Sequence, residues 1–225
     1  MARLGSRDNC QVPPSSTARA SLPRAPSQRD QQKQATRETL RSTALRLFVE
    51  HGFRETTAEE IAAAAGVSRR TFFLHFASKD EVLLGHIAEE LAMLRAELDA
   101  ASASLEPAAR AGQAVTRLAQ LLQQRDELLL QLDLLNRAPE LLAVNLEQFT
   151  AFETAIADAV RSWIVGPRRR RLSNDEDAFA ELVGTVGIAA LRAGLNVWRR
   201  GGGRGQLHRL VAANMRRLAD GLNTP

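Results

Sequence analysis

The sequence predicts an all-α protein of about nine helices, and three observations carry this prediction. From about residue 35 onward, apolar residues recur at the three- and four-residue spacing of one face of an amphipathic helix. No stretch shows the period-two alternation of apolar and polar residues that a half-buried strand requires. Glycine, proline, serine and threonine stand between the periodic stretches, at places where helices end and begin.

The composition is that of a folded soluble protein, with 44% hydrophobic and 25% charged residues in a chain of 225. The single cysteine excludes an intramolecular disulfide and a cysteine-based metal site. The four histidines lack the spacing of a helical metal site. We therefore expect no metal and no cofactor. Because the sequence has no run of about 18 apolar residues and no secretory signal, we expect a cytoplasmic protein.

The first helix is expected to begin near Ala35. Leu40, Ala44 and Phe48 would form its apolar face, since they follow one another at four-residue spacing. Gly52 would end it, because a residue without Cβ accepts the positive φ of a helix C-terminus.

Two short helices are expected next, over residues 57–65 and 68–73, with a tight turn at Gly66 between them. Thr57 and Ser68 are suitable N-caps for the two helices. Two short helices joined by a glycine turn form the helix-turn-helix arrangement.

A longer helix is expected from Ser78 to about Ala100, since Ser78 is a suitable N-cap and Glu81 stands at the capping-box position. This helix would serve as a lever between two parts of the protein. Five more helices are expected over residues 107–124, 126–136, 139–165, 174–199 and 206–222.

The helix that begins at Ser68 carries the chemistry of the predicted helix-turn-helix. Phe72 and Phe76 would pin it to its neighbours, and polar residues would face outward. Arg69 and Arg70 stand together at its start. Arginine reads guanine edges bidentately in the major groove and neutralises phosphate. The pattern favours binding of double-stranded DNA, with ordinary solvated charge as the alternative.

At these residues the chain resembles the TetR family of transcriptional regulators. The resemblance is carried, in order, by the segments LFVEHGF (47–53), TTAEEIA (56–62), AGVS (65–68) and TFFLHFASK (71–79). It implies a homodimeric repressor that binds a palindromic operator and is released by a small-molecule effector.

The resemblance also implies DNA contacts by position. Base edges would be met by Arg69, Arg70 and Thr71, beside the cap Ser68. Phosphates or the sugar backbone would be held by Thr57, Phe73, His75 and Lys79. Phe73 departs from the family, which usually has tyrosine there, so its ring can pack but cannot donate a hydrogen bond to phosphate.

Three regions follow from these observations. Residues 1–34, rich in Ser, Pro, Gln and Arg, predict a disordered basic tail that either strengthens DNA binding or is a spacer. Residues 35–84 would form the DNA-binding domain. Residues 85–225 would form a helical domain that senses the ligand and dimerises.

The middle helices of the third region would enclose a pocket for a hydrophobic or amphipathic ligand. The alternative is that these side chains only fill the core. The candidate lining residues are Met93, Arg117, Leu118, Leu122, Gln131, Leu132, Leu135, Asn136, Gln148, Phe149, Phe152 and Trp163.

The resemblance implies that the last two helices form the dimer interface, and small residues at three- and four-residue spacing would allow a second helix to approach closely. Packing within one chain is the alternative. The candidate interface residues are Gly184, Gly187, Ala190, Leu191, Gly194, Leu207, Leu210, Val211, Asn214 and Leu218.

The sequence therefore predicts a DNA-binding transcriptional regulator. A ligand-independent regulator or a chromosome-organising factor is the first alternative. An enzyme is not expected, because no nucleophile elbow, phosphate loop or metal set occurs, and the pair Glu89 and Glu90 is interpreted as a solvated helix face. The effector, the operator, the target genes and the sign of regulation are not readable from the sequence.

Overall fold

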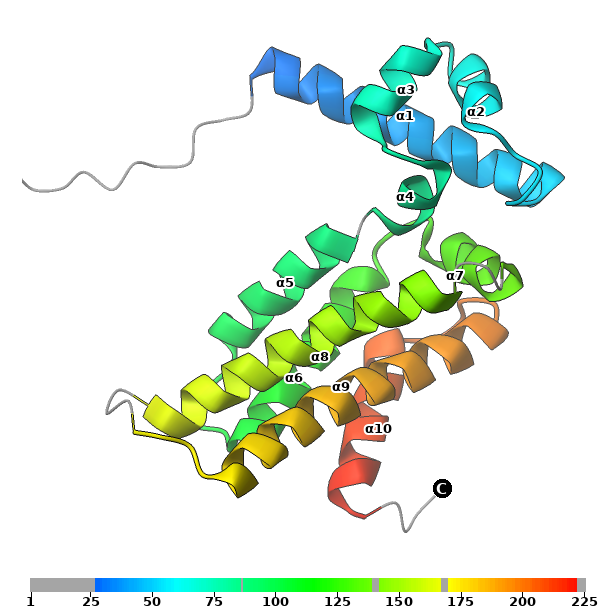
Figure 1. The fold of residues 1–225 in the computed structure, drawn as a ribbon. Coiled ribbons are helices and arrows are strands. Elements are labelled where there is room, and N and C mark those ends of the chain that lie inside the picture. Colours follow the sequence, from blue (N-terminus) through cyan, green and yellow to red (C-terminus); the bar gives the residue numbers. More distant parts are fainter. Residues whose placement is uncertain (1–26, 86, 139–141, 167–169, 222–225) are drawn as a thin grey trace, which may run out of the picture.

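The computed structural model describes residues 27–85, 87–138, 142–166 and 170–221, and within these residues every regular element is a helix (Figure 1). This confirms the all-α prediction. The ten helices are α1 (Gln28–His51), α2 (Ala58–Ala64), α3 (Arg69–His75), α4 (Lys79–Leu84), α5 (Ile87–Ala100), α6 (Pro107–Leu122), α7 (Leu128–Arg137), α8 (Leu142–Val165), α9 (Asn174–Arg200) and α10 (Leu207–Ala219).

The first helix begins earlier than expected. Ser27 caps α1: its Oγ accepts from the amide of Asp30, and the Asp30 carboxylate accepts from the amide of Ser27. This reciprocal pair satisfies two backbone donors that a helix start otherwise leaves open. The prediction of disorder is therefore wrong for residues 28–34, which are helical, while the rest of the expected tail lies outside the described residues.

The expected lever helix is two helices. α4 ends at Leu84 and α5 begins at Ile87, so the prediction of one continuous helix over 78–100 is wrong, and it accounts for the tenth helix. Glycine in a helix costs about 1 kcal/mol relative to alanine, which weakens the helix at Gly85. The backbone there is also crowded, since a Cβ on Gly85 would lie 2.4 Å from the Glu81 carbonyl oxygen.

Two apolar cores lie on either side of this break (Figure 1). α1 to α4 enclose one core around Leu40, Phe48 and Phe72. α5 to α10 enclose a larger one. α7 contributes to both, because its Leu134 belongs to the first core and Leu128, at its start, to the second. The division expected near residue 85 stays a prediction, and α7 is the element that bridges it.

α9 runs along α8 through the larger core (Figure 1). Among the described residues it is the one helix long and apolar enough to cross a membrane, but half of that apolar stretch is buried inside the protein. Its apolar character is therefore explained by packing against α6, α8 and α10.

Candidate nucleic-acid interface and internal cavity

Capping residues fix the two short helices of the helix-turn-helix. At the start of α2, Thr57 donates its amide to the Glu60 carboxylate over 2.8 Å and its Oγ1 accepts from the Glu60 amide. The hydrogen bonds that the Thr57 amide and hydroxyl donate to the carboxylate lower the pKa of Glu60. Gly66 makes the turn with φ +70°. Ser68 then caps α3 by accepting the amide of Thr71 over 3.0 Å.

α3 is held by aromatic side chains beneath it. Phe72 and Phe76 are 0% and 2% exposed, with ring centroids 5.8 Å apart. The guanidinium of Arg37 on α1 lies 4.2 Å from the Phe76 ring centroid and donates to the carbonyl oxygen of His75, the last residue of α3. The opposite face of α3 is open, with Leu74 69% exposed.

Arg69 and Arg70 lie on the exposed side of α3, as the sequence predicts. Nε of Arg69 pairs with Glu59 of α2 over 2.7 Å, and its guanidinium lies 5.5 Å from the Phe73 ring centroid. The Phe73 ring is itself 44% exposed. Arg69 is thus oriented by the Glu59 carboxylate. The DNA contact predicted for Arg69 would replace this ion pair, and it stays a prediction.

Lys79 has a role that the sequence did not reveal. Its ammonium donates to the carbonyl oxygens of Phe53, Arg54 and Thr56 at 2.6, 2.9 and 2.9 Å. An ammonium has three donors, so all of them serve the loop between α1 and α2. A phosphate contact by Lys79 would have to replace one of these bonds, and it stays a prediction.

His75 lies half-buried at the C-terminus of α3. Burial is the largest cause that lowers the pKa of His75, followed by the positive charges of Arg37 and Lys33. Both causes favour the neutral imidazole. A neutral imidazole still has one N–H to donate, which is what the predicted phosphate contact requires.

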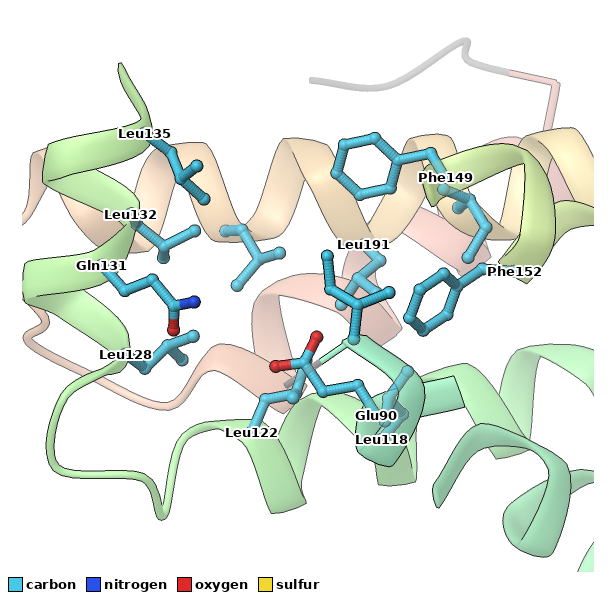
Figure 2. A pocket seen from close by; sticks show the side chains of 13 residues that line it. Glu90, Leu118, Leu122, Leu128, Gln131, Leu132, Leu135, Phe149, Phe152 and Leu191 are labelled. Atoms are coloured by element: carbon cyan, nitrogen blue, oxygen red, sulfur yellow. The ribbon is translucent and has the colours of Figure 1, made fainter. Parts of the chain in front are cut away.

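An apolar cavity of about 80 Å³ lies between α5, α6, α7, α8 and α9 (Figure 2). Seven of the twelve candidate pocket residues line it: Leu118, Leu122, Gln131, Leu132, Leu135, Phe149 and Phe152. The remaining lining residues were not candidates for the pocket: Ile87, Glu90, Leu128, Ile188, Leu191 and Leu195. Leu191, expected at the dimer interface, faces the cavity instead.

The other pocket candidates lie elsewhere. Met93 and Asn136 are exposed. Arg117 lies 3.9 Å from Glu97 in an ion pair on the surface, and the ring of Trp163 packs under the guanidinium of Arg110 at 4.0 Å. These assignments to the pocket are wrong because helical spacing does not tell which side of a helix meets which neighbour. The side chain of Gln148 lies outside the described part of the chain.

Glu90 is the main polar residue of the cavity that the sequence did not predict. Its side chain is only 12% exposed and is paired with Arg125, so the interpretation of Glu90 as part of a solvated face is wrong. Burial raises the pKa of Glu90 to about 7, against the opposing charges of Arg125 and Arg41. Beside it, the Gln131 amide donates to the carbonyl oxygen of Leu83 in α4 over 2.6 Å. The cavity wall is thus bonded directly to the helix that follows the helix-turn-helix.

The small residues of α9 serve packing within the chain. A Cβ on Gly184 would lie 2.5 Å from the Glu153 carbonyl oxygen of α8, and one on Gly194 would lie 2.7 Å from Val211 of α10. Gly187 faces α6 and α8. Close approach of helices was therefore predicted correctly, but the partner helices belong to the same chain.

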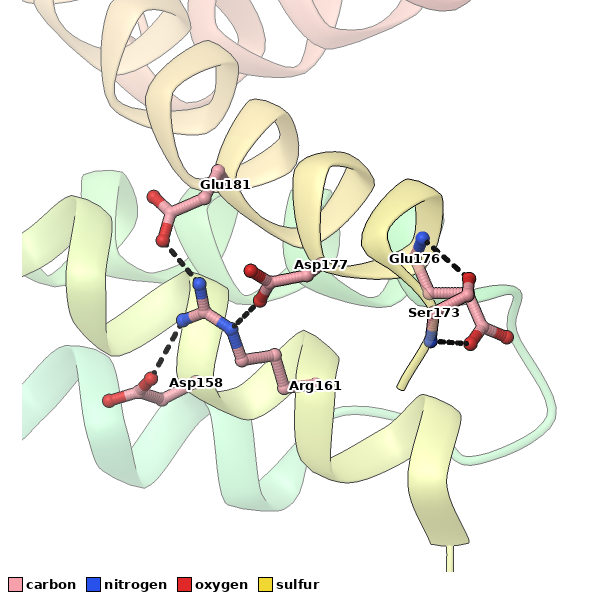
Figure 3. A network of polar contacts seen from close by, with 6 residues as sticks. All are labelled: Asp158, Arg161, Ser173, Glu176, Asp177 and Glu181. Atoms are coloured by element: carbon pink, nitrogen blue, oxygen red, sulfur yellow. Dashed lines mark hydrogen bonds and ion pairs between the residues drawn. The ribbon is translucent and has the colours of Figure 1, made fainter. Parts of the chain in front are cut away.

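Ion pairs on the surface reinforce the α8–α9 contact (Figure 3). Arg161 of α8 bonds Asp158 of its own helix and reaches Asp177 and Glu181 of α9, with 2.6 Å to Asp177. These bonds raise the pKa of Arg161, so its charge is permanent. Ser173 caps α9 at this same end by accepting the amide of Glu176.

Most of the other predicted interface residues also lie inside the chain. Leu207 and Val211 are fully buried, and the Asn214 amide donates to the Ala190 carbonyl over 3.0 Å. Leu210 packs against the larger core, and Leu218 is half-buried. The assignment of Leu207, Val211 and the three glycines to a dimer interface is corrected accordingly.

A different face of α9 is apolar and exposed. Phe179, Leu182 and Val197 are 40%, 60% and 47% exposed, and Ala189 and Ala193 lie exposed between them. Gaps of three, seven, four and four residues keep these side chains on one stripe. We call these five residues the α9 stripe.

Comparison with known proteins agrees with this arrangement. The sequence pattern described as bacterial regulatory proteins, tetR family, matches residues 40–85, and the pattern described as the MftR C-terminal domain matches residues 105–223, more than half of the chain. The regulator TcmR of Streptomyces glaucescens is 47% identical over 68 residues, which are 30% of each chain. The mycofactocin biosynthesis regulator MftR of Mycobacterium tuberculosis is 37% identical over 67 residues, 30% of this chain and 34% of MftR.

Solved structures extend the likeness to most of the fold. The repressor FadR of Thermus thermophilus, solved with lauroyl-CoA, is 28% identical with a TM-score of 0.52, over 84% of this chain and 96% of FadR. SmeT of Stenotrophomonas maltophilia shares the fold at 23% identity and a TM-score of 0.56, over 86% of this chain and 95% of SmeT. A helix-turn-helix joined to a helical core is thus shared with these proteins, and the chain belongs to the tetR family of bacterial regulatory proteins. The chain spans about a third of the length of the curated regulators named above.

Proposed function

We propose that the protein is a homodimeric DNA-binding transcriptional repressor that leaves its operator when a small molecule enters the internal cavity. The observation that carries the DNA-binding part is the build of α3. Its buried side is anchored by Phe72 and Phe76, while Arg69 and Arg70 are exposed at its capped start. This is the arrangement of a recognition helix that enters a major groove.

Dimerisation is supported by the α9 stripe. Exposing a run of apolar side chains along a long helix to water is unfavourable for a monomer, and such a patch typically marks an interaction surface. Covering it with a second copy would also serve DNA binding, because two recognition helices must reach half-sites about 34–36 Å apart.

The cavity supports the effector part of the proposal. A core filled completely by leucine side chains would indicate a regulator that binds no ligand. This core instead contains a cavity lined mostly by apolar side chains. FadR, the relative of known structure with 28% identity, was solved with lauroyl-CoA. Since the proposed target is chromosomal DNA, the protein would act in the cytoplasm.

Two contacts would transmit the effector signal through the start of α7. Gln131 joins the cavity to the Leu83 carbonyl of α4, and Glu127 pairs with Arg41 of α1 over 3.4 Å. A ligand that favours another position of α7 would thereby favour another position of the DNA-binding part. Such couplings are typically about 1–3 kcal/mol.

The test begins with a genomic pull-down that identifies the operator. Arg70→Ala should then weaken operator binding by about 1–3 kcal/mol and relax base preference, because it removes a groove-facing guanidinium. Arg95→Ala, which removes an exposed arginine of α5, is the matched control. Unchanged operator binding by Arg70→Ala, or an equal loss in Arg95→Ala, would contradict the proposed recognition role.

A further inference from the structure

The cavity has two chemically different ends. Eleven of its thirteen lining residues are apolar, and Glu90 is the one ionisable residue among them. Figure 2 shows the Glu90 carboxylate extending from α5 toward the end where Leu122, Leu128 and Gln131 lie. Phe149 and Phe152 of α8 line the other end. A ligand that fills the cavity therefore meets a carboxylate at one end and aromatic rings at the other.

We propose that the effector is an amphipathic cation, with a protonated amine that binds Glu90 and a short apolar body that packs toward Phe149 and Phe152. The inference rests on the proposed function, since it assumes that the cavity is the effector site. It deepens that proposal by naming the class of ligand.

The ligand is expected to donate hydrogen bonds because the carboxylate that faces the cavity accepts them. A carboxylate has about four acceptor positions, so Glu90 can accept from Arg125 and from a ligand at the same time. Arg125 pairs with Glu90 but does not itself line the cavity, so Glu90 is the ionisable group that a ligand in the cavity meets. Above about pH 7, where Glu90 is ionised, it would repel a ligand carboxylate, whereas an ammonium would form a charge-assisted hydrogen bond with it.

The surroundings make this contact strong and selective. Most neighbours of the carboxylate within the cavity are leucine and isoleucine side chains, so few other polar groups compete for the ligand. Charges attract more strongly where water is excluded. The volume of about 80 Å³ has room for several water-sized atoms and limits the apolar body to a short chain or a small ring, unless the walls move apart.

The experiment uses the full-length protein and a matched series of ligands. Straight-chain amines, alcohols and carboxylates of four to eight carbons would be titrated by calorimetry and by thermal shift. At equal chain length, we expect the amine to bind at least tenfold more tightly than the carboxylate, with the alcohol between them. Equal binding of the three head groups, or tighter binding of the carboxylate, would overturn the inference.

Two variants locate the effect. Glu90→Gln keeps the size of the side chain and should reduce amine affinity about tenfold while leaving alcohol affinity unchanged. Glu89→Gln, on the exposed neighbour, should change neither. If Glu90→Gln binds amines as tightly as the wild type, Glu90 is not the head-group site. Because the head-group preference is also measured in the wild-type protein, instability of Glu90→Gln leaves the inference testable.

The variant Leu132→Trp tests whether the cavity is the binding site, independently of which class of ligand binds there. The larger side chain should fill the cavity beside α7, where Figure 2 places Leu132, and abolish binding of amine and alcohol alike. If alcohols bind and are blocked by Leu132→Trp but amines have no advantage, the ligand class is wrong and the effector cavity stands. If no ligand of any class binds, the proposed effector site fails together with the inference.

Discussion

Glu90 couples the stability of the protein to pH. Burial raises the pKa of Glu90 from 4.5 to about 7, while Arg125 and Arg41 oppose the shift and Glu89 adds to it. The folded protein thus holds this proton more tightly than the unfolded chain. The contribution of Glu90 to stability is present below about pH 4.5 and is lost as the pH rises through about 7.

The expected result is a fall in the free energy of unfolding between pH 5 and 8, by up to about 3 kcal/mol from this group. Urea unfolding of wild type and Glu90→Gln across this range would measure it, because the variant cannot titrate there. Glu89→Gln should keep most of the wild-type slope, because Glu89 contributes less to the shift than burial, Arg125 and Arg41. Parallel pH profiles for wild type and Glu90→Gln would show that the carboxyl ionises normally.

A variant of Lys79 can show whether this side chain stabilises the α1–α2 loop or contacts DNA. Lys79→Met keeps the aliphatic stem but leaves three carbonyl oxygens of the α1–α2 loop without their donor. We expect thermal unfolding to show a loss of about 1–3 kcal/mol. Lys33→Met, at an exposed position of α1, should change stability little. Wild-type stability of Lys79→Met together with weaker operator binding would instead support the phosphate contact implied by the family resemblance.

At the scale of the element, Gly85 sets two effects against each other. Helix propensity alone predicts that Gly85→Ala stabilises by about 1 kcal/mol. The added Cβ would lie 2.4 Å from the Glu81 carbonyl oxygen and 3.2 Å from Arg37, a clash that the backbone must relieve by moving. Overpacking typically costs about 1–3 kcal/mol, so we expect the clash to prevail and the melting temperature to fall.

A companion variant calibrates this prediction. Ala92→Gly, on the exposed face of α5, reports helix propensity without a packing change and should cost about 1 kcal/mol. If Gly85→Ala raises the melting temperature, the α4–α5 break is a consequence of weak helix propensity. The contacts of the added Cβ would then not lower the free energy of unfolding.

The elements that the sequence predicted well are those decided by local chemistry. Ser68 and Ser78 cap α3 and α4, and Gly66 makes the turn, because capping bonds and a positive φ depend on neighbouring residues only. The break at Gly85 escaped prediction, since an isolated glycine is often tolerated within a helix. The early start of α1 was missed because residues 28–34 are polar and exposed, without the apolar periodicity that marks a helix.

At the scale of the whole molecule, the sequence could not tell which surfaces meet. The glycines of α9 have the spacing expected of any close helix contact, and only the folded chain shows that α6, α8 and α10 fill that role. Glu90 has the composition of a solvated face, and its burial depends on α7 and Arg125, far away in sequence. The candidate cavity was predicted better, since seven of its residues lie on helices whose apolar faces point into one core.

The correction to the interface leads to a test of assembly. With Gly184, Gly187 and Gly194 buried inside the chain, α9 offers the α9 stripe to a second copy. Leu182 is the most exposed of its large side chains, at 60%, so Leu182→Glu should leave the fold of the monomer intact. In a dimer the new carboxylate would be buried without a partner, which costs several kcal/mol.

We therefore expect Leu182→Glu to shift the protein from dimer to monomer in light scattering, with unchanged helical content by circular dichroism. Operator binding should fall at the same time, since a single recognition helix contacts one half-site only. Ala92→Glu adds the same charge to an exposed position of α5 and should remain dimeric. A Leu182→Glu protein that stays dimeric and binds its operator would place the interface elsewhere on the molecule and leave the α9 stripe without an assigned partner.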